Sequence, residues 1–391
     1  MMRGLFLFAI FINGAGSSIL AVGYPYSFLT THTNMTYYFI SMGVVFFLTA
    51  IGALLWGYKI DHSTNIWDFR LKILAVEFLA TFLLLMLLMA GITFHPLALL
   101  IFIALLEFLF AYEIPWSRVA WNDLNKWGVT RGWKKINPAM YIVITTSLIS
   151  AVGPGIGAFL GAINNIKLLV AIKLISLIPY YFVCIKIIQI KKEKNNVHVR
   201  NSTNTTTLAF FFRQPPYQTL TACVILTLLA NAFLIVSLPV EVTKSITTIN
   251  NIWLVFFYLF SATIPVASTA LLRKLKWDVL PQRHPVTIFI AMLLFGFLFF
   301  FTEIFYYKCL FYLLYNVAAI WFNTLLTDII YQKKFEKQQG RLFSLIQVTT
   351  NFSFPLAAVI MAFTPESFQM ILPIISFSVL SVLAVVIYLL T

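Results

Sequence analysis

Long apolar runs recur along the whole chain, and they constrain its fold more than any other feature. A membrane-spanning helix needs roughly 20 mostly apolar residues in succession. Apolar residues make up 61% of the chain and charged residues 10%, whereas a soluble domain has about a quarter charged residues. We therefore predict an all-α membrane protein. The twelve predicted spans are 4–26, 36–58, 71–92, 97–115, 139–162, 166–189, 217–240, 251–272, 285–303, 306–330, 342–363 and 370–390.

A polar segment at 190–216 divides these predicted spans into two groups of six. Its charged and Ser/Thr/Asn-rich composition is typical of a flexible linker. We therefore predict an N-terminal six-helix bundle at 1–189, a cytoplasmic linker at 190–216 and a C-terminal six-helix bundle at 217–391. Two shorter polar connections are predicted at 116–138 and 331–341.

The distribution of Lys and Arg predicts the orientation. Of the 27 basic residues, 23 fall on one side of the predicted spans, three on the other, and Lys173 lies within a span. Because Lys and Arg accumulate on the cytoplasmic side, both termini are expected to be cytoplasmic. The polar connection at 116–138 contains four tryptophans, and we predict that they anchor it at the membrane interface. They are Trp116, Trp121, Trp127 and Trp133.

Several classes of function find no support in the residues. The three cysteines are isolated in apolar runs, and no His/Cys/carboxylate group has metal-ligand spacing. The chain also lacks the phosphate-binding GxxxxGK[ST] loop of an ATP-driven motor. We therefore expect no metal, no cofactor and no enzymatic activity. The net charge of +14 is explained by orientation, so no nucleic acid partner is expected.

Ionisable residues inside the predicted spans are the strongest functional candidates, because each is costly in a membrane. Glu107 is expected near mid-membrane, and Glu77 and Glu113 in the inner third. Glu107 and Glu113 are six residues apart, about 120° around a helix, so they cannot both face one cavity squarely. Glu107 is our candidate for binding substrate or a proton, and a neutral structural hydrogen bond is the alternative. Lys173 either pairs with an acid or attracts an anionic substrate.

Other polar or aromatic residues at mid-depth complete the predicted pathway for protons and substrate. They are Asn13, Ser17, Asn231, Asn316, Trp321 and Asn323.

Small residues line one face of the span at 139–162. Gly153, Gly157 and Gly161 recur every four residues, which allows a neighbouring helix to approach closely. Pro154 removes a backbone donor and favours a kink. The pattern predicts a close helix crossing, with a role in transport direction as the alternative.

Several motifs, in the same order, resemble those of the major facilitator superfamily, especially its branch of bacterial exporters that includes the enterobactin exporter. They are Gly57-Tyr-Lys-Ile-Asp61 with Arg70-Leu-Lys72, then Pro115-Trp-Ser-Arg118, Asn137-Pro-Ala-Met140, Gly153-Pro154-Gly-Ile-Gly157-Ala158 and Gln339-Gly340-Arg341-Leu-Phe-Ser344. The resemblance covers nearly the whole chain. It implies the major facilitator fold, in which the first, fourth, seventh and tenth spans line the pathway.

The resemblance also implies a gate at the cytoplasmic mouth. Asp61 would lie against the N-terminal end of the eleventh span, and Arg70 would reach Glu113 at the inner end of the fourth. Gly57, Arg118 and Arg341 are the other gating residues that it implies. The alternative for Asp61 and Arg70 is surface charge that only sets the topology.

The function that the resemblance implies is secondary active transport. We expect proton-coupled export of a small amphipathic molecule, siderophore-like or drug-like, by a monomer in the lipid of a bacterial cytoplasmic (inner) membrane. The alternatives are a lysolipid or lipid flippase, an uptake transporter of the same fold, and a membrane scaffold that transports nothing.

Overall fold

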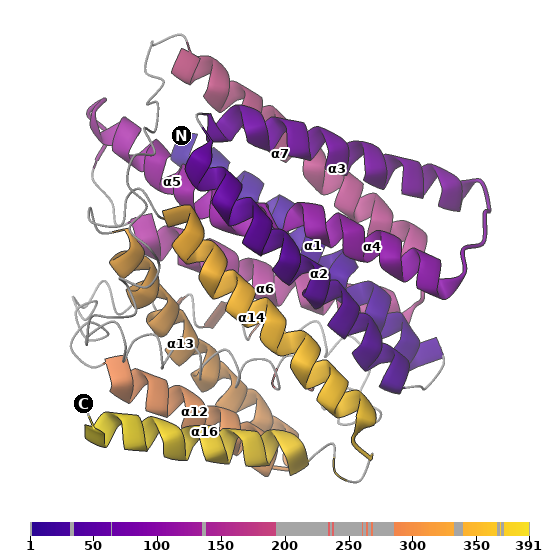
Figure 1. The fold of residues 1–391 in the computed structure, drawn as a ribbon, viewed down its shortest axis with the longest axis vertical. Coiled ribbons are helices and arrows are strands. Elements are labelled where there is room, and N and C mark those ends of the chain that lie inside the picture. Colours follow the sequence, from indigo (N-terminus) through magenta and orange to yellow (C-terminus); the bar gives the residue numbers. More distant parts are fainter. Residues whose placement is uncertain are drawn as a thin grey trace.

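The computed structural model is an assembly of long helices (Figure 1). It describes residues 2–31, 35–63, 65–134, 138–192, 285–331, 339–365 and 371–390, with isolated residues between 234 and 268 and at 368. The helices are α1 (Met2–Thr31), α2 (Met35–His62), α3 (Ile66–Met89), α4 (Pro96–Phe110), α5 (Glu113–Val129), α6 (Pro138–Ala162), α7 (Ile166–Lys192), α12 (Pro285–Phe301), α13 (Phe305–Ile330), α14 (Gln339–Phe363) and α16 (Ile371–Leu390).

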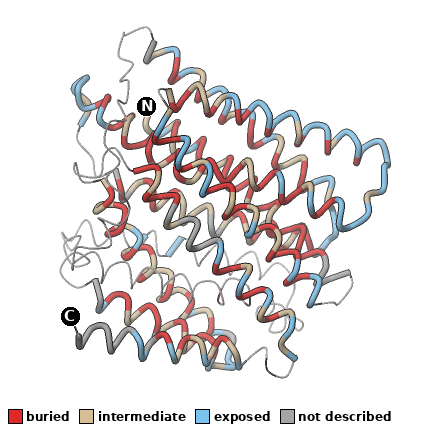
Figure 2. Tube along the Cα trace, viewed as in Figure 1, coloured by how far each residue is buried: buried red, intermediate tan, exposed pale blue. Residues whose placement is uncertain are grey.

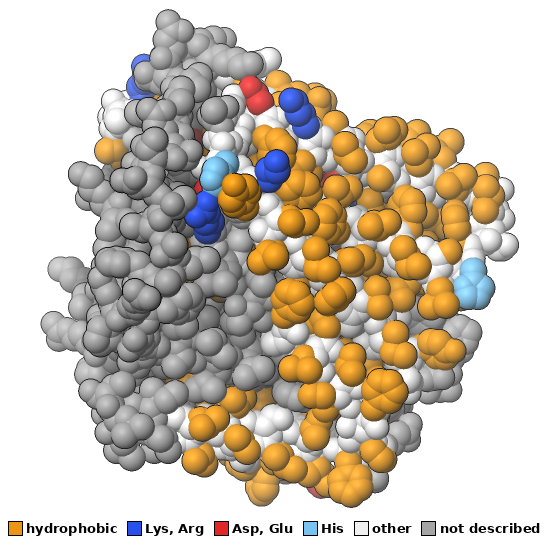
Figure 3. Space-filling view, in the orientation of Figure 1, with side chains coloured by type: hydrophobic (Ala, Val, Ile, Leu, Met, Phe, Trp, Pro, Cys, Tyr) orange, Lys and Arg blue, Asp and Glu red, His pale blue; other side chains and the backbone are white. Residues whose placement is uncertain are grey.

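The described helices have the length and composition of membrane spans. Seven are long and apolar enough to cross a membrane, with α4 and α5 counted together as Pro96–Val129, and three more are shorter apolar helices. A helix satisfies its own backbone hydrogen bonds, as a chain surrounded by lipid requires. Apolar side chains cover most of the described face in Figure 3, and the charged ones gather toward one end. The chain is therefore an α-helical integral membrane protein, as the sequence predicts.

Apart from isolated residues, the predicted spans at 217–240 and 251–272 lie outside the described residues, as does the predicted linker except for 190–192. The first six predicted spans all correspond to described helices. Of the described C-terminal helices, α12, α13 and α16 lie together on one side of them, and α14 lies along α2 (Figure 1).

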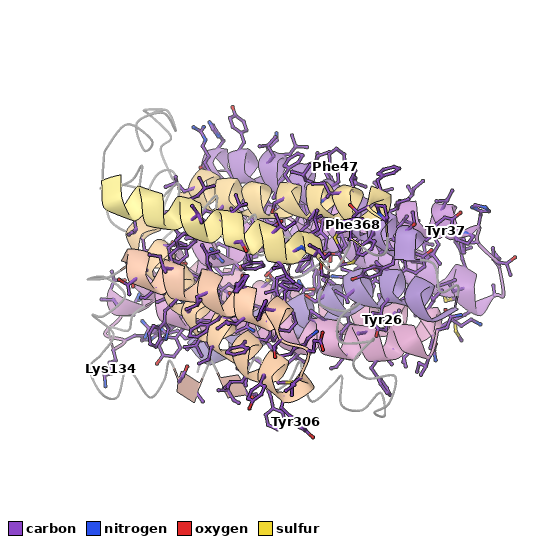
Figure 4. All side chains as sticks on the ribbon, turned by 90° about the horizontal axis from the view of Figure 1, so that it is seen from below. Tyr26, Tyr37, Phe47, Lys134, Tyr306 and Phe368 are labelled. Carbon is purple, nitrogen blue, oxygen red and sulfur yellow. The ribbon has the colours of Figure 1, made fainter. Side chains whose placement is uncertain are left out.

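One end of the bundle carries the start of α1 and the segment that ends at Lys134. Arg3 Nη1 donates a hydrogen bond to the Lys134 carbonyl at 2.6 Å, so the start of α1 lies beside the end of the 116–134 segment. Figure 4 shows Lys134 at one end of the molecule and Tyr26 and Tyr37 at the other. We call the end that carries Arg3, Asp61 and Lys134 the basic end.

The helical region at the fourth predicted span extends beyond the predicted end at residue 115. Helix α4 ends at Phe110, but α5 resumes at Glu113 and continues to Val129, where a polar connection was predicted. The prediction of interface anchors is wrong for Trp116 and Trp121, which are fully buried within the protein. Phe6 of α1 packs against Trp116 with ring centroids 5.8 Å apart, because α5 lies under α1 rather than on the membrane surface.

Glycines of α6 form the closest crossing with α1. A Cβ atom added to Gly157 would lie 2.7 Å from the Ile19 carbonyl oxygen, and one added to Gly153 would lie 3.2 Å from the Ala15 carbonyl. Gly161 similarly faces Gly23 of α1. The predicted close approach is therefore present. A role of this face in transport direction remains a prediction.

Replacement of Gly157 by leucine is expected to destabilise the protein, because the atoms it would strike belong to the backbone of α1. Overpacking of this kind costs about 1–3 kcal/mol. Thermal unfolding of the purified protein in detergent measures the loss. Gly4→Leu is the matched control, since an added Cβ there meets nothing within 4 Å. Equal melting temperatures for the two variants would show that the crossing tolerates a side chain.

Candidate functional site

Five charged side chains meet inside the N-terminal half. Arg70 and Glu77 come from α3, Glu107 from α4, Glu113 from α5 and Lys173 from α7, and none is more than 4% exposed. We call these five residues the buried charge cluster. Figure 2 shows the buried stretches of these helices in red, toward the middle of the N-terminal half.

Arg70 joins two of the carboxylates. Its Nη2 atom lies 2.7 Å from Glu113 Oε2, and its Nη1 atom lies 3.6 Å from Glu77 Oε2. The Tyr180 hydroxyl also donates a hydrogen bond to Glu113 Oε2 at 2.6 Å. The guanidinium lies 5.8 Å from the centre of the Trp116 ring. The contact between Arg70 and Glu113 that the family resemblance implies is therefore present.

Lys173 binds the other oxygen of Glu77. Its Nζ atom lies 2.5 Å from Glu77 Oε1 and donates a hydrogen bond to the hydroxyl of Ser17 on α1. The close approach of α7 to α1 depends on Gly16, where an added Cβ would lie 2.6 Å from Ser176 Cβ. Of the two alternatives for Lys173, the structure has the pairing with an acid.

Glu107 is the member without a close cation. It interacts electrostatically with Lys173 and Glu77. Within the part of the chain that the structure describes, its Oε1 atom has no hydrogen-bond partner and the side chain forms no ion pair. Three carboxylates share two cations, so the fully ionised cluster carries a net charge of −1. Burying an unpaired charge is expensive, and uptake of one cation, including a proton, removes that cost.

Asn13 and Ser17 lie on the side of α1 that faces this cluster. They are one helical turn apart and both fully buried. Residue 6 is nearly in line with them on a helix of 3.6 residues per turn, and Phe6 packs against Trp67 of α3 at 5.5 Å. Neither amide atom of Asn13 has a hydrogen-bond partner among the described residues. These two residues therefore belong to the interior of the N-terminal half.

The candidates of the C-terminal half are separate from the cluster. Asn316 Nδ2 donates a hydrogen bond to the Tyr312 carbonyl of its own helix, α13, at 2.8 Å. Trp321 is partly buried and Asn323 is exposed on the same helix. No contact between described residues joins these three to the cluster. Asn231 lies outside the described residues.

A shallow apolar pocket opens between α1 and α6. Its volume is about 240 Å³, and it is lined by Leu7, Phe8, Phe11, Thr145 and Leu148. Phe8 is 58% exposed and points away from the side of α1 that carries Asn13. The pocket and the buried charge cluster therefore lie on opposite sides of α1.

At the basic end, α2 contacts the first turn of α14. The Asp61 carboxylate accepts hydrogen bonds from the backbone N–H groups of Gly340 at 3.0 Å and Arg341 at 2.8 Å. A helix N-terminus carries a partial positive charge and unpaired N–H groups, so it binds a carboxylate well. A side chain at Gly57 would collide with Ser344. The position that the resemblance implies for Asp61 is therefore present, while its role in gating remains a prediction.

A further polar contact between the halves at the basic end was not predicted. Asn122 Nδ2 donates a hydrogen bond to Gln339 Oε1 at 3.0 Å, and both side chains are buried. The Tyr331 hydroxyl donates to the Arg118 carbonyl at 2.9 Å, and the Arg118 guanidinium lies 5.0 Å from the centre of the Phe343 ring. Asn122 was missed because its segment reads as a polar loop, and a polar residue in a loop carries no packing signal.

Loss of the Asp61 charge is expected to loosen this end of the bundle. Asp61→Asn removes the attraction to the start of α14, and an amide has one acceptor oxygen for two N–H donors. Exchange of the Gly340 and Arg341 amides with deuterated solvent should then accelerate by about tenfold, the effect of about 1.4 kcal/mol. Asp68→Asn is the control, because Asp68 accepts a hydrogen bond from neighbouring Asn65. Unchanged exchange in Asp61→Asn would indicate that the charge of Asp61 only sets the topology of the chain in the membrane.

The fold and these contacts define a polytopic helical membrane protein whose two halves meet along α2 and α14, from Met42 and Met361 in one apolar cluster to Asp61 and Gly340 at the basic end. A scan against protein-family models and a search of curated proteins found no match. Solved structures do match. A crystal structure of a bacterial homologue of the iron transporter ferroportin, in an outward-facing state, has a TM-score of 0.67 and 17% identity, over 100% of this chain and 98% of that one.

A second solved structure has the same arrangement. The human organic anion transporter MFSD10 (TETRAN) has a TM-score of 0.66 and 11% identity, over 99% of this chain and 97% of that one. The ferroportin homologue with soaked iron also matches, with a TM-score of 0.63, 15% identity and coverage of 100% and 98%. The chain therefore has the major facilitator fold that the sequence predicts. Similarity at this level of identity establishes the fold alone.

Proposed function

We propose that the protein is a secondary active transporter that exports a small amphipathic molecule in exchange for protons. The unbalanced negative charge of the buried charge cluster carries this proposal. Glu107 is the carboxylate of the cluster that has no ion pair among the described residues. A major facilitator fold that works by alternating access exposes such a group to each side of the membrane in turn. A scaffold without transport would gain nothing from so costly an arrangement.

Glu107 is the proton site of this mechanism. Proton binding neutralises the cluster and proton release restores its charge, so the free energy of the proton gradient is delivered to the protein at this residue. Asn13 and Ser17 support the site from α1. Lys173 is engaged by Glu77, which disfavours a direct role in holding an anionic substrate.

The substrate occupies the space between the halves. Asn316, Trp321 and Asn323 of α13 contribute polar and aromatic contacts, and the pocket beside Phe8 accepts an apolar group. This combination suits an amphipathic, siderophore-like or drug-like molecule. In the proposed arrangement the protein is a monomer in a bacterial cytoplasmic membrane. The basic end faces the cytoplasm, and 190–216 links the bundles at 1–189 and 217–391.

A comparison of metabolites tests the function. Cells that produce the wild-type protein and cells that produce Glu107→Gln are compared by untargeted mass spectrometry of cytoplasm and medium. Export predicts a compound that is enriched in the medium only with the wild-type protein. Enrichment in the cytoplasm would instead establish uptake. A shift confined to membrane lipids would favour a flippase, and identical profiles would favour the scaffold.

A further inference from the structure

Four side chains form a row of alternating charges, in the order Lys173, Glu77, Arg70 and Glu113. The two in the middle each use one atom for one neighbour and another atom for the other. Glu77 binds Lys173 through Oε1 and Arg70 through Oε2. Arg70 in turn binds Glu77 through Nη1 and Glu113 through Nη2. The seven residues from Arg70 to Glu77 correspond to about 10 Å along α3. The row therefore connects the neighbourhood of Glu107 with α5.

Helix α5 links Glu113 to the start of α14. Glu113 lies in its first turn, and Asn122 lies nine residues further along the same helix. Asn122 donates its hydrogen bond to Gln339, the first residue of α14. Gly340 and Arg341, the two residues bound by Asp61, follow directly. Glu113 and the residue that contacts the start of α14 therefore lie on one continuous helix.

We propose that Lys173 and Glu77 are positioning residues that transmit the charge state of Glu107 to the contact between α5 and α14. When Glu107 is neutral, Lys173 stays with Glu77, and Arg70 remains with Glu113. When Glu107 is ionised, it attracts Lys173, and Glu77 then draws Arg70 away from Glu113. The contact at the basic end is weakened as a result. This inference rests on Glu107 as the proton site of the proposed function.

The surroundings of the row favour this route over others. Lys173 is the one described cation that interacts electrostatically with Glu107, and it also interacts with Glu113. Helix α1 offers Lys173 the uncharged hydroxyl of Ser17, and α4 offers the Phe110 ring at 4.8 Å. The other titratable groups around Arg70 and Glu113 are Tyr112, Tyr180 and Cys184. Helix α2, which packs on α4 and α5, carries its charged groups at the basic end, namely Lys59, Asp61 and His62.

Amide exchange at Gly340 and Arg341 reports on this contact without any substrate. The protein is placed in lipid nanodiscs, and exchange is measured from about pH 5 to about pH 8 and normalised to the intrinsic rate at each pH. In the wild type, protection of these amides should fall by about tenfold as the pH rises, a coupling within the usual range for linked sites. In Glu107→Gln the protection should be high and independent of pH.

Variants of the ion pair separate transmission from folding. Lys173→Met alone leaves Glu77 with less compensation and can destabilise the protein, so Lys173→Met/Glu77→Gln removes both charges together. This double variant should lose the pH dependence, whereas Lys173→Arg should retain it. Lys167→Met is the matched control on an exposed position of α7, and it should behave as the wild type.

Two outcomes would overturn the inference. The first is a wild-type pH dependence in Lys173→Met/Glu77→Gln, which would show that Glu107 acts by another route while the proposed function stands. The second is exchange in the wild type that does not change with pH. The metabolite comparison decides the proposed function independently, because it measures export and this experiment measures only the contact between the halves.

Discussion

Glu107→Gln is expected to abolish accumulation driven by a pH gradient while the protein still folds and inserts. Glutamine has nearly the same volume as a protonated glutamate, and it cannot release a proton. The cluster would then remain neutral in every state, and the proton gradient could no longer drive transport. In membrane vesicles, uphill transport of the compound found by metabolite comparison should fall by tenfold or more, about the size of a strong coupling between sites. The remaining downhill exchange should not depend on external pH.

Glu303→Gln is the control for this experiment. Glu303 is exposed, between α12 and α13, so its loss should leave both the rate and the pH profile unchanged. An unchanged pH profile in Glu107→Gln would assign Glu107 to structure. Glu77 and Glu113 would then be the remaining carboxylates of the cluster to replace.

Arg70→Met is expected to cause the largest loss of stability of any single replacement in the cluster. Arg70 is fully buried and binds two carboxylates. Among the described residues, its removal leaves Glu113 with the Tyr180 hydroxyl as its one hydrogen-bond partner. Removing one partner of a buried ion pair costs about 3–5 kcal/mol. The yield of folded protein and its melting temperature in detergent should both drop sharply.

A compensating replacement distinguishes the loss of charge balance from the loss of packing. Arg70→Met/Glu113→Gln removes both charges, and it should recover most of the lost stability because methionine fills much of the same space. Lys72→Met provides the control, since Lys72 is exposed two residues along the same helix. Failure of the double variant to recover would mean that Arg70 stabilises the protein through its aromatic contacts with Tyr112, Trp116 and Tyr180.

The sequence predicts which charged residues are buried, but it does not predict which of them pair. Glu77, Glu107, Glu113 and Lys173 are recognisable in the sequence because a charge within an apolar run is costly wherever the helix packs. The pairing of Lys173 with Glu77 depends on how α7 lies beside α3, which neither run specifies. The segment of α5 shows the limit most clearly. Its charged and aromatic residues resemble a surface loop, yet Trp116 and Trp121 are buried because α1 covers them.

The sequence by itself determined that this chain is a bundle of membrane-spanning helices with buried carboxylates. Hydropathy is a local property, and a run of about 20 apolar residues has few alternatives to a helix in lipid. Only the tertiary structure decided which polar groups meet. Asn122 and Gln339 are 217 residues apart, and Asn13 faces the buried charge cluster rather than the pocket beside Phe8. Such contacts depend on the rotation and crossing of whole helices, and these are set by packing among all of them together.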